Sequence, residues 1–403
     1  MNILQICNKV PFPPKDGGCI AMNNLTQGLI AEGNQVKVMA INTEKHFIDI
    51  EKLPLIYTSK TRVEAIFIDT KIKVMAAFLN LFSNRSYNID RFYSINFENR
   101  LIEILKSEVF DIVHLESLYV SMYVDTIRKY SSAKIILRAH NVEYRLWEHA
   151  AQLTKNPFKK TYLKFLARRL KLYELASLQR YDAIAGITKK DGIHFKRAGF
   201  LKAIETIPFG IDFKNNIEIN PEQAEYVSVF HIGAMDWQPN IIGINWFLDE
   251  VWDLVRLKHP QLKLYLAGRN MSEELKKLKK PNVIIMGEVE NSQAFIQSKG
   301  IMIVPLLSGE GMRVKIIEGL ALGKTIVTTT IGLEGIDGEN NKNCIIADDA
   351  IAFAEAISKC ISDKIFYDEI GKNARILAAQ HYNNADICKR LVQFYQKVVS
   401  NNN

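Results

Sequence analysis

The sequence predicts an α/β protein with two domains, each built around a parallel β-sheet, and three observations lead to that fold class. Short apolar segments rich in β-branched residues alternate with longer amphipathic segments over most of the chain, a pattern typical of repeated strand–helix units. The alternation stops at a polar stretch, 213–226, and then starts again. The length of 403 residues is enough for two or three domains with separate cores.

Each half of the chain supplies its own set of expected strands, with helices between them. In the first half, strands are expected at 3–7, 35–41, 63–69, 111–117, 134–140, 183–188 and 203–208. In the second half, they are expected at 227–233, 263–268, 283–287, 301–306, 325–330 and 344–348, followed by helices at 349–361, 364–379 and 384–399. We therefore expect domains at 1–212 and 213–380. The remaining segment, 381–403, is a candidate to pack back on the first domain.

The composition is that of a globular protein, with 48% apolar and 24% charged residues. The longest apolar stretch, 74–82, has nine residues, whereas a membrane-spanning helix needs about 20. The N-terminus lacks the features of a signal peptide, so we expect a cytoplasmic protein. The five cysteines form no C-x-x-C pair and have no histidines at metal spacing, which argues against disulfides and against a zinc site.

The net positive charge comes entirely from the first half. Residues 1–212 carry 31 Lys and Arg against 21 Asp and Glu, whereas the remainder carries 21 against 23. A basic domain of this kind is compatible with nucleic acid, with an anionic membrane surface or with acidic substrates. Composition alone does not choose among them.

The most informative segment is 301–330, in which a buried strand leads through Ser-Gly-Glu-Gly at 308–311 into an amphipathic helix. Gly309 and Gly311 allow the backbone to turn sharply and to approach a ligand, and the N-terminus of the following helix favours an anion. Glu310 and Glu318 lie before and along this helix, where carboxylates accept hydrogen bonds from sugar or ribose hydroxyls. The ordinary alternative is that both are solvated surface charges.

This segment resembles the signature of the retaining glycosyltransferases of family 4, a branch of the glycosyl transferases group 1 with the GT-B fold. That signature has a Glu, seven intervening residues, a second Glu and a small-residue helix ending in Gly, and Glu310 and Glu318 occupy its two positions. The resemblance extends over nearly the whole chain and is closest to enzymes of polysaccharide assembly. It implies two Rossmann-like domains that face each other across a cleft.

Other segments agree with the resemblance. The pair Gly17 and Gly18 follows the first strand and opens the first helix, where the family approaches a diphosphate. Segment 206–212 resembles the end of the first domain, and 231–247 resembles the first strand and helix of the donor domain. The residues thereby expected at the donor are Gly17, Gly18, Gly233, Gly309, Gly311, Met312 and Glu318.

The sequence departs from the family pattern at one point. Family members usually carry an Arg after the glycine that matches Gly233 and a Lys about five residues later, but Ala234 follows here and no cation comes before Asn240. A diphosphate leaving group needs compensating charge. We hypothesise that Arg313 and Lys315, at the start of the motif helix, supply it. The alternative is that they are ordinary surface cations.

The first domain contains the residues expected at the acceptor. His140 lies at the carboxyl end of an expected strand, where α/β domains bind ligands, and it matches the family histidine that faces the transferred sugar. Its expected roles are hydrogen bonding to a hydroxyl or stabilising developing charge. Glu116, Asn141 and Glu143 are weaker candidates for the acceptor. With Glu310, Arg313 and Lys315, His140 completes the expected catalytic set.

A basic region, 155–180, contains eight Lys or Arg and one Glu. Apolar residues recur along it at helical spacing and are expected to face the core, namely Phe158, Tyr162, Leu166, Leu170 and Tyr173. The cations lie on a parallel stripe roughly opposite, which is either a solvated face or a surface that contacts anionic lipid. The segment 70–93 combines cations with aromatics and is a second candidate for such a surface.

We therefore expect a retaining glycosyltransferase that moves a sugar from a UDP or GDP sugar to a saccharide or lipid-linked acceptor, without a metal, since the sequence has no Asp-x-Asp motif. Glu318 would bind the ribose and Glu310 the sugar hydroxyls. Two related alternatives are a sugar-nucleotide epimerase and an inverting transferase. Two others are an inactive sugar-nucleotide binder, suggested by the missing cation pair, and a nucleic-acid-binding protein, for which we find no motif and which we do not favour.

Overall fold

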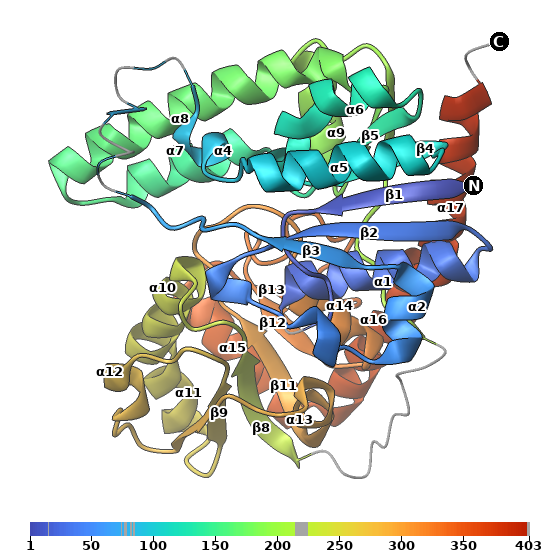
Figure 1. The fold of residues 1–403 in the computed structure, drawn as a ribbon. Helices are drawn as coiled ribbons and strands as arrows, with labels where there is room; N and C mark the ends of the chain where they lie inside the picture. Colours follow the sequence, from blue (N-terminus) through green and yellow to red (C-terminus); the bar gives the residue numbers. More distant parts are fainter. Residues whose placement is uncertain are drawn as a thin grey trace. The chain divides into compact units, whose positions relative to one another are not determined.

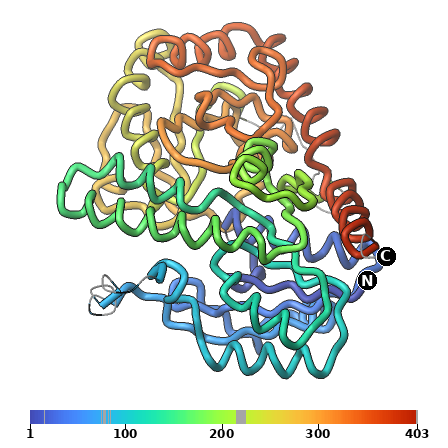
Figure 2. Tube along the Cα trace, turned by 90° about the horizontal axis from the view of Figure 1, so that it is seen from above, coloured from blue at the N-terminus to red at the C-terminus, as the bar shows by residue number. Residues whose placement is uncertain are grey.

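A computed structural model describes residues 1–14, 16–73, 75, 79–80, 83, 85–213 and 225–400. The chain forms two compact units, one made of Met1–Pro208 with Ala385–Asn403 and the other of Phe209–Asn384. Figures 1 and 2 show the chain in two views, and each unit is described here by itself. None of the helices within these ranges is long and apolar enough to cross a bilayer.

The first unit contains a seven-stranded parallel sheet with the order β3-β2-β1-β4-β5-β6-β7. Its strands are β1 Asn2–Cys7, β2 Gln35–Asn42, β3 Glu64–Phe67, β4 Ile112–Glu116, β5 Lys134–Ala139, β6 Ala183–Gly186 and β7 Ala203–Thr206. The strand order reverses between β1 and β4, which makes their carboxyl ends the expected place for a ligand.

The helices of the first unit flank this sheet. They are α1 Gly17–Ala31, α2 Leu55–Thr61, α4 Tyr87–Asp90, α5 Ile95–Ser107, α6 Val124–Tyr130, α7 Glu143–Leu153, α8 Pro157–Ser177, α9 Lys189–Arg197 and α17 Asn384–Ser400. Single turns lie at η1 Glu44–His46, η2 Ile50–Lys52, η3 Leu118–Tyr123 and η4 Leu178–Arg180. α7 and α8 run side by side as a helical hairpin (Figure 1).

The two faces of the first sheet are covered by different helices because successive residues of a strand point to opposite sides. On one face, Leu4, Met39 and Leu115 pack in a cluster that includes residues of α5, α6 and α8. On the other face, Ile3, Val38 and Ile112 pack with α1 and with α17. The last helix of the chain is thus part of the first unit's core, and it passes close to the N-terminus in both views (Figures 1 and 2). Its buried residues there are Ile387, Cys388, Leu391, Phe394, Tyr395 and Val398.

The second unit contains a six-stranded parallel sheet with the order β10-β9-β8-β11-β12-β13. Its strands are β8 Glu225–Ile232, β9 Lys263–Ala267, β10 Val283–Gly287, β11 Lys299–Val304, β12 Ile326–Thr328 and β13 Ile345–Ile346. Its helices are α10 Gln238–Trp246, η6 Phe247–Val251, α11 Trp252–Lys258, α12 Glu273–Lys276, α13 Ser292–Ser298, α14 Val314–Ala321, α15 Ala350–Ser362 and α16 Lys364–His381. The predicted α/β fold class, with two parallel sheets, is confirmed.

The boundaries of the units differ slightly from the expected 1–212, 213–380 and 381–403. Ile211 pairs with Asn383, and its N–H donates to the carbonyl of Tyr382. Residues 209–212 therefore belong with the second unit, and the chain leaves that unit at Asn384. Most of the expected linker 213–226, and residues 74, 76–78, 81–82 and 84 of the expected surface segment 70–93, lie outside the described residues.

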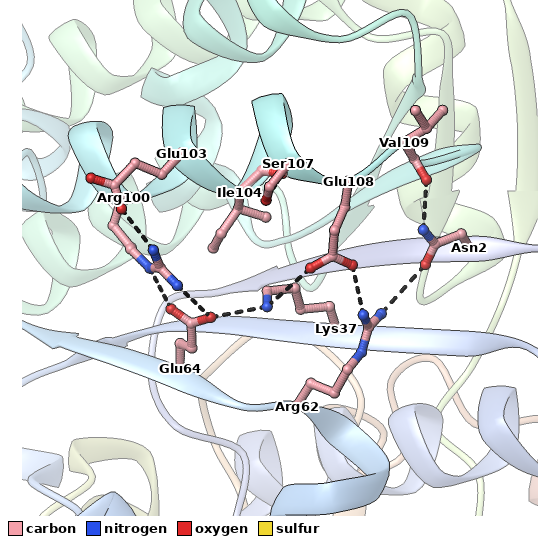
Figure 3. Close-up of polar contacts among 10 residues, drawn as sticks. All are labelled: Asn2, Lys37, Arg62, Glu64, Arg100, Glu103, Ile104, Ser107, Glu108 and Val109. Carbon is pink, nitrogen blue, oxygen red and sulfur yellow. Dashed lines mark hydrogen bonds and ion pairs between the residues drawn. The ribbon is translucent and has the colours of Figure 1, made fainter.

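Two groups of basic residues, those of α8 and those near β2 and β3, bear on how the positive charge of the first half is used. In α8, Leu166 and Leu170 are buried as expected, but the expectation that Phe158 faces the core is wrong, because its side chain is 87% exposed in the first turn. Elsewhere, Lys37, Arg62 and Arg100 form ion pairs with Glu64, Glu103 and Glu108 that join β2 and β3 to α5 (Figure 3). Part of the positive charge therefore has a structural use.

Candidate active site

In the first unit, His140 follows β5 directly, and its side chain is 14% exposed. It lies on the face of the sheet that α17 covers, because Arg138 and His140 alternate with the apolar residues of the opposite face. The Nε2 atom of His140 lies 2.7 Å from Oε2 of Glu116, at the end of the neighbouring strand β4. The structure thus brings two of the expected site residues together.

Glu116 is fully buried and is the centre of a polar network. Gln5 Nε2 donates to Glu116 Oε1 over 2.9 Å, and His114 Nε2 lies 3.1 Å from the same oxygen. The Nε atom of Arg138 lies 3.7 Å from Oε2. Burial by itself raises the pKa of Glu116, but the nearby ring nitrogens of His114 and His140 outweigh it and hold that pKa well below its ordinary value. The carboxylate is therefore ionised and accepts hydrogen bonds from within the protein.

The network continues into the last helix of the chain. The hydroxyl of Tyr395, on α17, lies 2.5 Å from Nδ1 of His114, and both side chains are completely buried. Burial lowers the pKa of His114, which favours its neutral form. Neither residue was expected at the site from the sequence. A signal for His114 was present, because it shares a strand face with Glu116, but nothing in the sequence placed Tyr395 beside it.

Asn141 and Glu143 lie beyond His140, at the start of α7. Asn141 is half-buried, whereas Glu143 is buried and accepts a hydrogen bond from the Tyr119 hydroxyl over 2.9 Å. The carboxylate of Glu174, on α8, accepts the backbone N–H groups of Glu143 and Tyr144 at the N-terminus of α7. Burial and the charge of Glu143 raise the pKa of Glu174 to about 8. Glu143 thus has a structural partner, and its expected contact with an acceptor stays a prediction.

Gly17 and Gly18 form the first residues of α1, as expected. Asp16 caps this helix by accepting the N–H of Cys19 and also pairs with Lys9 at 2.6 Å. A Cβ atom on Gly18 would lie 3.0 Å from Nζ of Lys9. The glycine therefore leaves room for a cation beside the helix N-terminus, an arrangement that suits an anionic group.

In the second unit, the loop between β11 and α14 is held in a tight turn. Gly309 and Gly311 have φ values of 114° and 85°, which only glycine adopts readily. Nη1 of Arg313 donates to the backbone carbonyls of Glu310 and Gly311, and its guanidinium lies 5.3 Å from the ring of Trp237. Arg313 thus stabilises the loop that the sequence analysis assigned to the donor.

Arg313 is only 5% exposed, and burial lowers its pKa to about 10. Its Nε and Nη2 atoms are buried without a hydrogen-bond partner among the described residues. Buried polar groups normally have partners, so two donors of this side chain remain for another group. A Cβ atom on Gly309 would lie 2.9 Å from Nη2, which is a second reason for glycine at that position.

Lys315 extends from α14 to the end of β8. Its Nζ donates to Oδ1 of Asn240 over 2.8 Å and lies 3.3 Å from Nε2 of His231. A Cβ atom on Gly233 would lie 2.9 Å from the same Nζ. Burial, together with the charge of Arg313, lowers the pKa of Lys315 to about 7. The lysine thus places its amino group directly beside Gly233, although the loop after Gly233 has no Arg or Lys of its own before Asn240. An anion bound there would favour the charged form of the lysine.

The remaining predicted residues of this unit lie on the same loop and helix. Met312 is buried and Glu310 is half-buried in the loop. Glu318 is half-buried on α14, and desolvation raises its pKa to about 7. His231 and Asn240, which hold Lys315 in place, were not predicted from the sequence. Within the described ranges, no group of three or more His, Cys, Asp or Glu side chains is arranged to hold a metal.

Comparison with known proteins bears on the second unit in particular. Residues 227–363 match the family model of the glycosyl transferases group 1, and this segment contains Gly233, the turn at Gly309 and Glu318. A relative from Klebsiella pneumoniae, described as an uncharacterized 44.6 kDa protein in the cps region, is 24% identical over 396 residues, 96% of this chain and 97% of the relative.

Solved structures resemble the whole chain. Sucrose-phosphate synthase from Thermosynechococcus elongatus has a TM-score of 0.74 at 15% identity, with both chains covered completely. HepE from Anabaena, in complex with UDP-glucose, has a TM-score of 0.66 at 13% identity, covering 98% of this chain and 99% of HepE. The predicted GT-B architecture is confirmed.

Proposed function

We propose that this chain, in which residues 227–363 match the family model of the glycosyl transferases group 1, is a glycosyltransferase. In this proposal it transfers a sugar from a nucleoside-diphosphate sugar to a saccharide or lipid-linked acceptor with retention of configuration. A UDP sugar is the first donor to test, because HepE was solved with UDP-glucose. The relative in the cps region supports a reaction in the assembly of capsule or another cell-surface polysaccharide.

The position of Lys315 is the observation that carries the proposal. Its ammonium lies beside Gly233, at the end of β8, and it is held there by Asn240. Arg313 adds a guanidinium with two buried nitrogens that lack partners in the described structure. Two desolvated cations near one helix N-terminus repel each other. The carboxylates of Glu334 and Glu310 act on Arg313, but burial still lowers its pKa, so a further anion between the two cations would be favourable. A diphosphate is the anion that this family of enzymes handles.

The other residues then take the roles that the resemblance implies. Glu318, with its raised pKa, would accept hydrogen bonds from ribose hydroxyls, and Glu310 would do so from the transferred sugar. His140 would contact the acceptor in the first unit. We propose that the departing phosphate oxygen removes the proton of the acceptor hydroxyl and that no divalent ion is required.

Donor binding is tested by thermal shift with UDP, GDP and a panel of their sugars. A ligand that binds only the native state raises the melting temperature with concentration. One class of nucleotide sugar is expected to do so for the wild type, and Arg313→Ala should weaken both the shift and the turnover. An unchanged rate in Arg313→Ala would refute its assigned role, and no shift with any nucleotide would refute the donor proposal.

The alternatives are separated by the products. A transferase releases the nucleoside diphosphate only as sugar is transferred or hydrolysed, whereas an epimerase returns an altered nucleotide sugar and an inactive binder returns the donor unchanged. The anomeric configuration of the transferred sugar distinguishes retention from inversion. EDTA should leave the rate unchanged.

We also propose that the α7–α8 hairpin contacts an anionic membrane surface on the cytoplasmic side, where lipid-linked acceptors are found. Lys159, Lys164 and Arg168 are exposed, and the exposed Phe158 and Leu172 add apolar area. Clustered cations with exposed apolar side chains favour lipid headgroups. Vesicles with phosphatidylglycerol should bind the wild type at low salt, and Lys164→Glu/Arg168→Glu should abolish binding; equal binding of both proteins would refute the proposal.

A further inference from the structure

The polar network around Glu116 has a single consistent assignment of its hydrogens. Ionised Glu116 has only acceptors, so both ring nitrogens that face it must carry a hydrogen. These atoms are Nε2 of His114, at 3.1 Å, and Nε2 of His140, at 2.7 Å. Gln5 turns its amide nitrogen to the same carboxylate, and its oxygen accepts the hydroxyl of Thr26 over 2.7 Å.

The hydrogen on Nε2 of His114 determines the direction of the next bond. Burial favours neutral His114, and a neutral ring with a hydrogen on Nε2 has an acceptor at Nδ1. The hydroxyl of Tyr395 must therefore donate to that nitrogen. The opposite direction would require His114 to turn a bare Nε2 toward a carboxylate, or to carry a buried charge, and both cost free energy.

The same reasoning determines the ring of His140. Its Nε2 carries a hydrogen in the neutral form and in the cation alike, because Glu116 accepts from it in both. Any hydrogen bond between His140 and an acceptor sugar must then be made through Nδ1. When the ring is neutral, Nδ1 accepts from a sugar hydroxyl, and when it is charged, Nδ1 donates to an oxygen.

We propose that Tyr395 is a positioning residue: its hydroxyl holds His114 with Nε2–H toward Glu116. This contact keeps the carboxylate in place to fix the tautomer and orientation of His140, so that Nδ1 is the atom presented to the acceptor. The contact of His140 with the acceptor rests on the proposed function, whereas the tautomers follow from the network alone. The chain is continuous from α17 across β4 to β5, and all its members belong to the first unit.

The burial of these polar residues indicates that the network does more than hold α17 against the sheet. Ile3, Val38 and Ile136 make the rest of this sheet face apolar, and polar groups in such a place cost free energy unless each is satisfied. Leucine and methionine at these positions would pack the helix against the sheet without that cost. The polar residues are placed instead in a row that ends at the half-buried His140.

The tautomers are measured directly by long-range ¹H–¹⁵N correlation spectra of the full-length protein with ¹⁵N-labelled histidine. His114→Asn and His140→Asn assign the two signals among the eight histidines. Both rings are expected to show the pattern of a hydrogen on Nε2 at neutral pH. A hydrogen on Nδ1 of neutral His114 or of neutral His140 would overturn the inference, whatever the enzyme's activity.

Tyr395→Phe removes only the hydroxyl and tests the coupling. The Nδ1 signal of His114 should shift, the His140 signals should broaden or split, and kcat should fall about three- to tenfold, the worth of one buried hydrogen bond, with an unchanged KM for the donor. Val398→Ala is the matched control on α17, because it loosens the packing of the helix outside the network.

The control should lower the melting temperature and leave both kcat and the histidine signals unchanged. If Tyr395→Phe behaves like the control, the positioning role is refuted. If the wild type transfers no sugar from any donor, the proposed function fails, and the spectra still decide the tautomers.

Discussion

In the first unit, the buried carboxylate of Glu116 accepts hydrogen bonds from neighbouring strands and has a lowered pKa, whereas in the second unit the carboxylate of Glu318 has a pKa raised to about 7 by desolvation alone. The cations differ in the same way. Arg138 lies beside Glu116, whereas Arg313 and Lys315 lie near each other and both have lowered pKa values. The network around Glu116 satisfies its buried charge internally, which does not hold for all of the first unit, because burial and the charge of Glu143 raise the pKa of Glu174 to about 8. The loop and helix with Arg313 and Lys315 leave charges for a ligand to satisfy.

This difference predicts opposite effects of mutation. Where charges are satisfied within the fold, their removal should cost stability. Where charged side chains are desolvated and have a partner only when a ligand is bound, their removal should lower activity and leave the free energy of unfolding the same or higher. Variants of Lys315, Glu116, Glu318 and Arg100 test that contrast.

The largest effect is expected for Lys315→Ala. Loss of a desolvated cation beside a diphosphate should lower kcat/KM about 100- to 1,000-fold, because the leaving group loses its compensating charge. The melting temperature without ligand should not fall, because the mutation removes an ammonium group whose charged form is disfavoured by burial. Steady-state kinetics and thermal unfolding measure the two effects.

Lys324 provides the matched control within the same unit. It is also a buried lysine with a pKa lowered to about 8 by desolvation, but its Nζ donates to the carbonyls of Gln297 and Lys299. Lys324→Met should lower the melting temperature and leave kcat/KM unchanged. If both variants lose stability and keep activity, the assignment of Lys315 to the donor is wrong.

Glu116→Gln is expected to lower the free energy of unfolding by about 2–4 kcal/mol. The amide nitrogen of the variant would replace either Oε1, which faces Gln5 and the ring N–H of His114, or Oε2, which faces the ring N–H of His140. Breaking a buried charged network has a cost of this order. Chemical denaturation measures it. Glu103→Gln, at an exposed position of the same unit, should change the free energy by less than about 0.5 kcal/mol. A Glu116→Gln variant as stable as wild type would mean that the network contributes nothing to folding.

The pH dependence of stability should reverse between the two carboxyl groups. The folded pKa of Glu116 is lowered, so its contribution is present above its ordinary pKa and is lost as the pH falls below it. The folded pKa of Glu318 is raised to about 7, so it lowers stability as the pH rises from about 4.5 to 7. Glu318→Gln should therefore gain about 1–3 kcal/mol over wild type across that window, and a constant difference would show that Glu318 is not desolvated.

The sequence predicted the architecture and the position of the second unit's loop well, because periodicity and glycine spacing are local signals. The strands of both sheets, Gly309, Gly311 and the helix carrying Glu318 all follow from short segments. The limits appeared where distant segments meet. Phe158 fitted the apolar stripe of α8, yet it lies exposed in the first turn of that helix, and helical periodicity carries no information about where the covered surface ends.

The site residues that were missed depend on contacts between distant segments. Tyr395 and His114 are separated by 281 positions, and Lys315 meets His231 and Asn240 from more than 70 positions away. Because a diphosphate needs compensating charge, we inferred that Arg313 and Lys315 replace the Arg and Lys that are missing after Gly233. The Nζ atom of Lys315 does lie beside Gly233. Its partners required the packed structure, because the sequence gives no measure of which side chains converge.

The smallest effect should come from the ion pairs between β3 and α5 (Figure 3), which resemble the Glu116 network in composition but not in burial. Arg100 binds both oxygens of Glu64 over 2.6 and 3.0 Å, and its side chain is 43% exposed. Arg100→Ala should lower the free energy of unfolding by only about 0.5–1 kcal/mol, because water and salt screen exposed pairs. In 1 M salt, on the order of a 3 Å screening length, that loss should shrink, whereas the loss in Glu116→Gln should persist. If salt reduces both losses equally, burial does not distinguish the two networks, and the contrast between internally satisfied and exposed charge in the first unit fails.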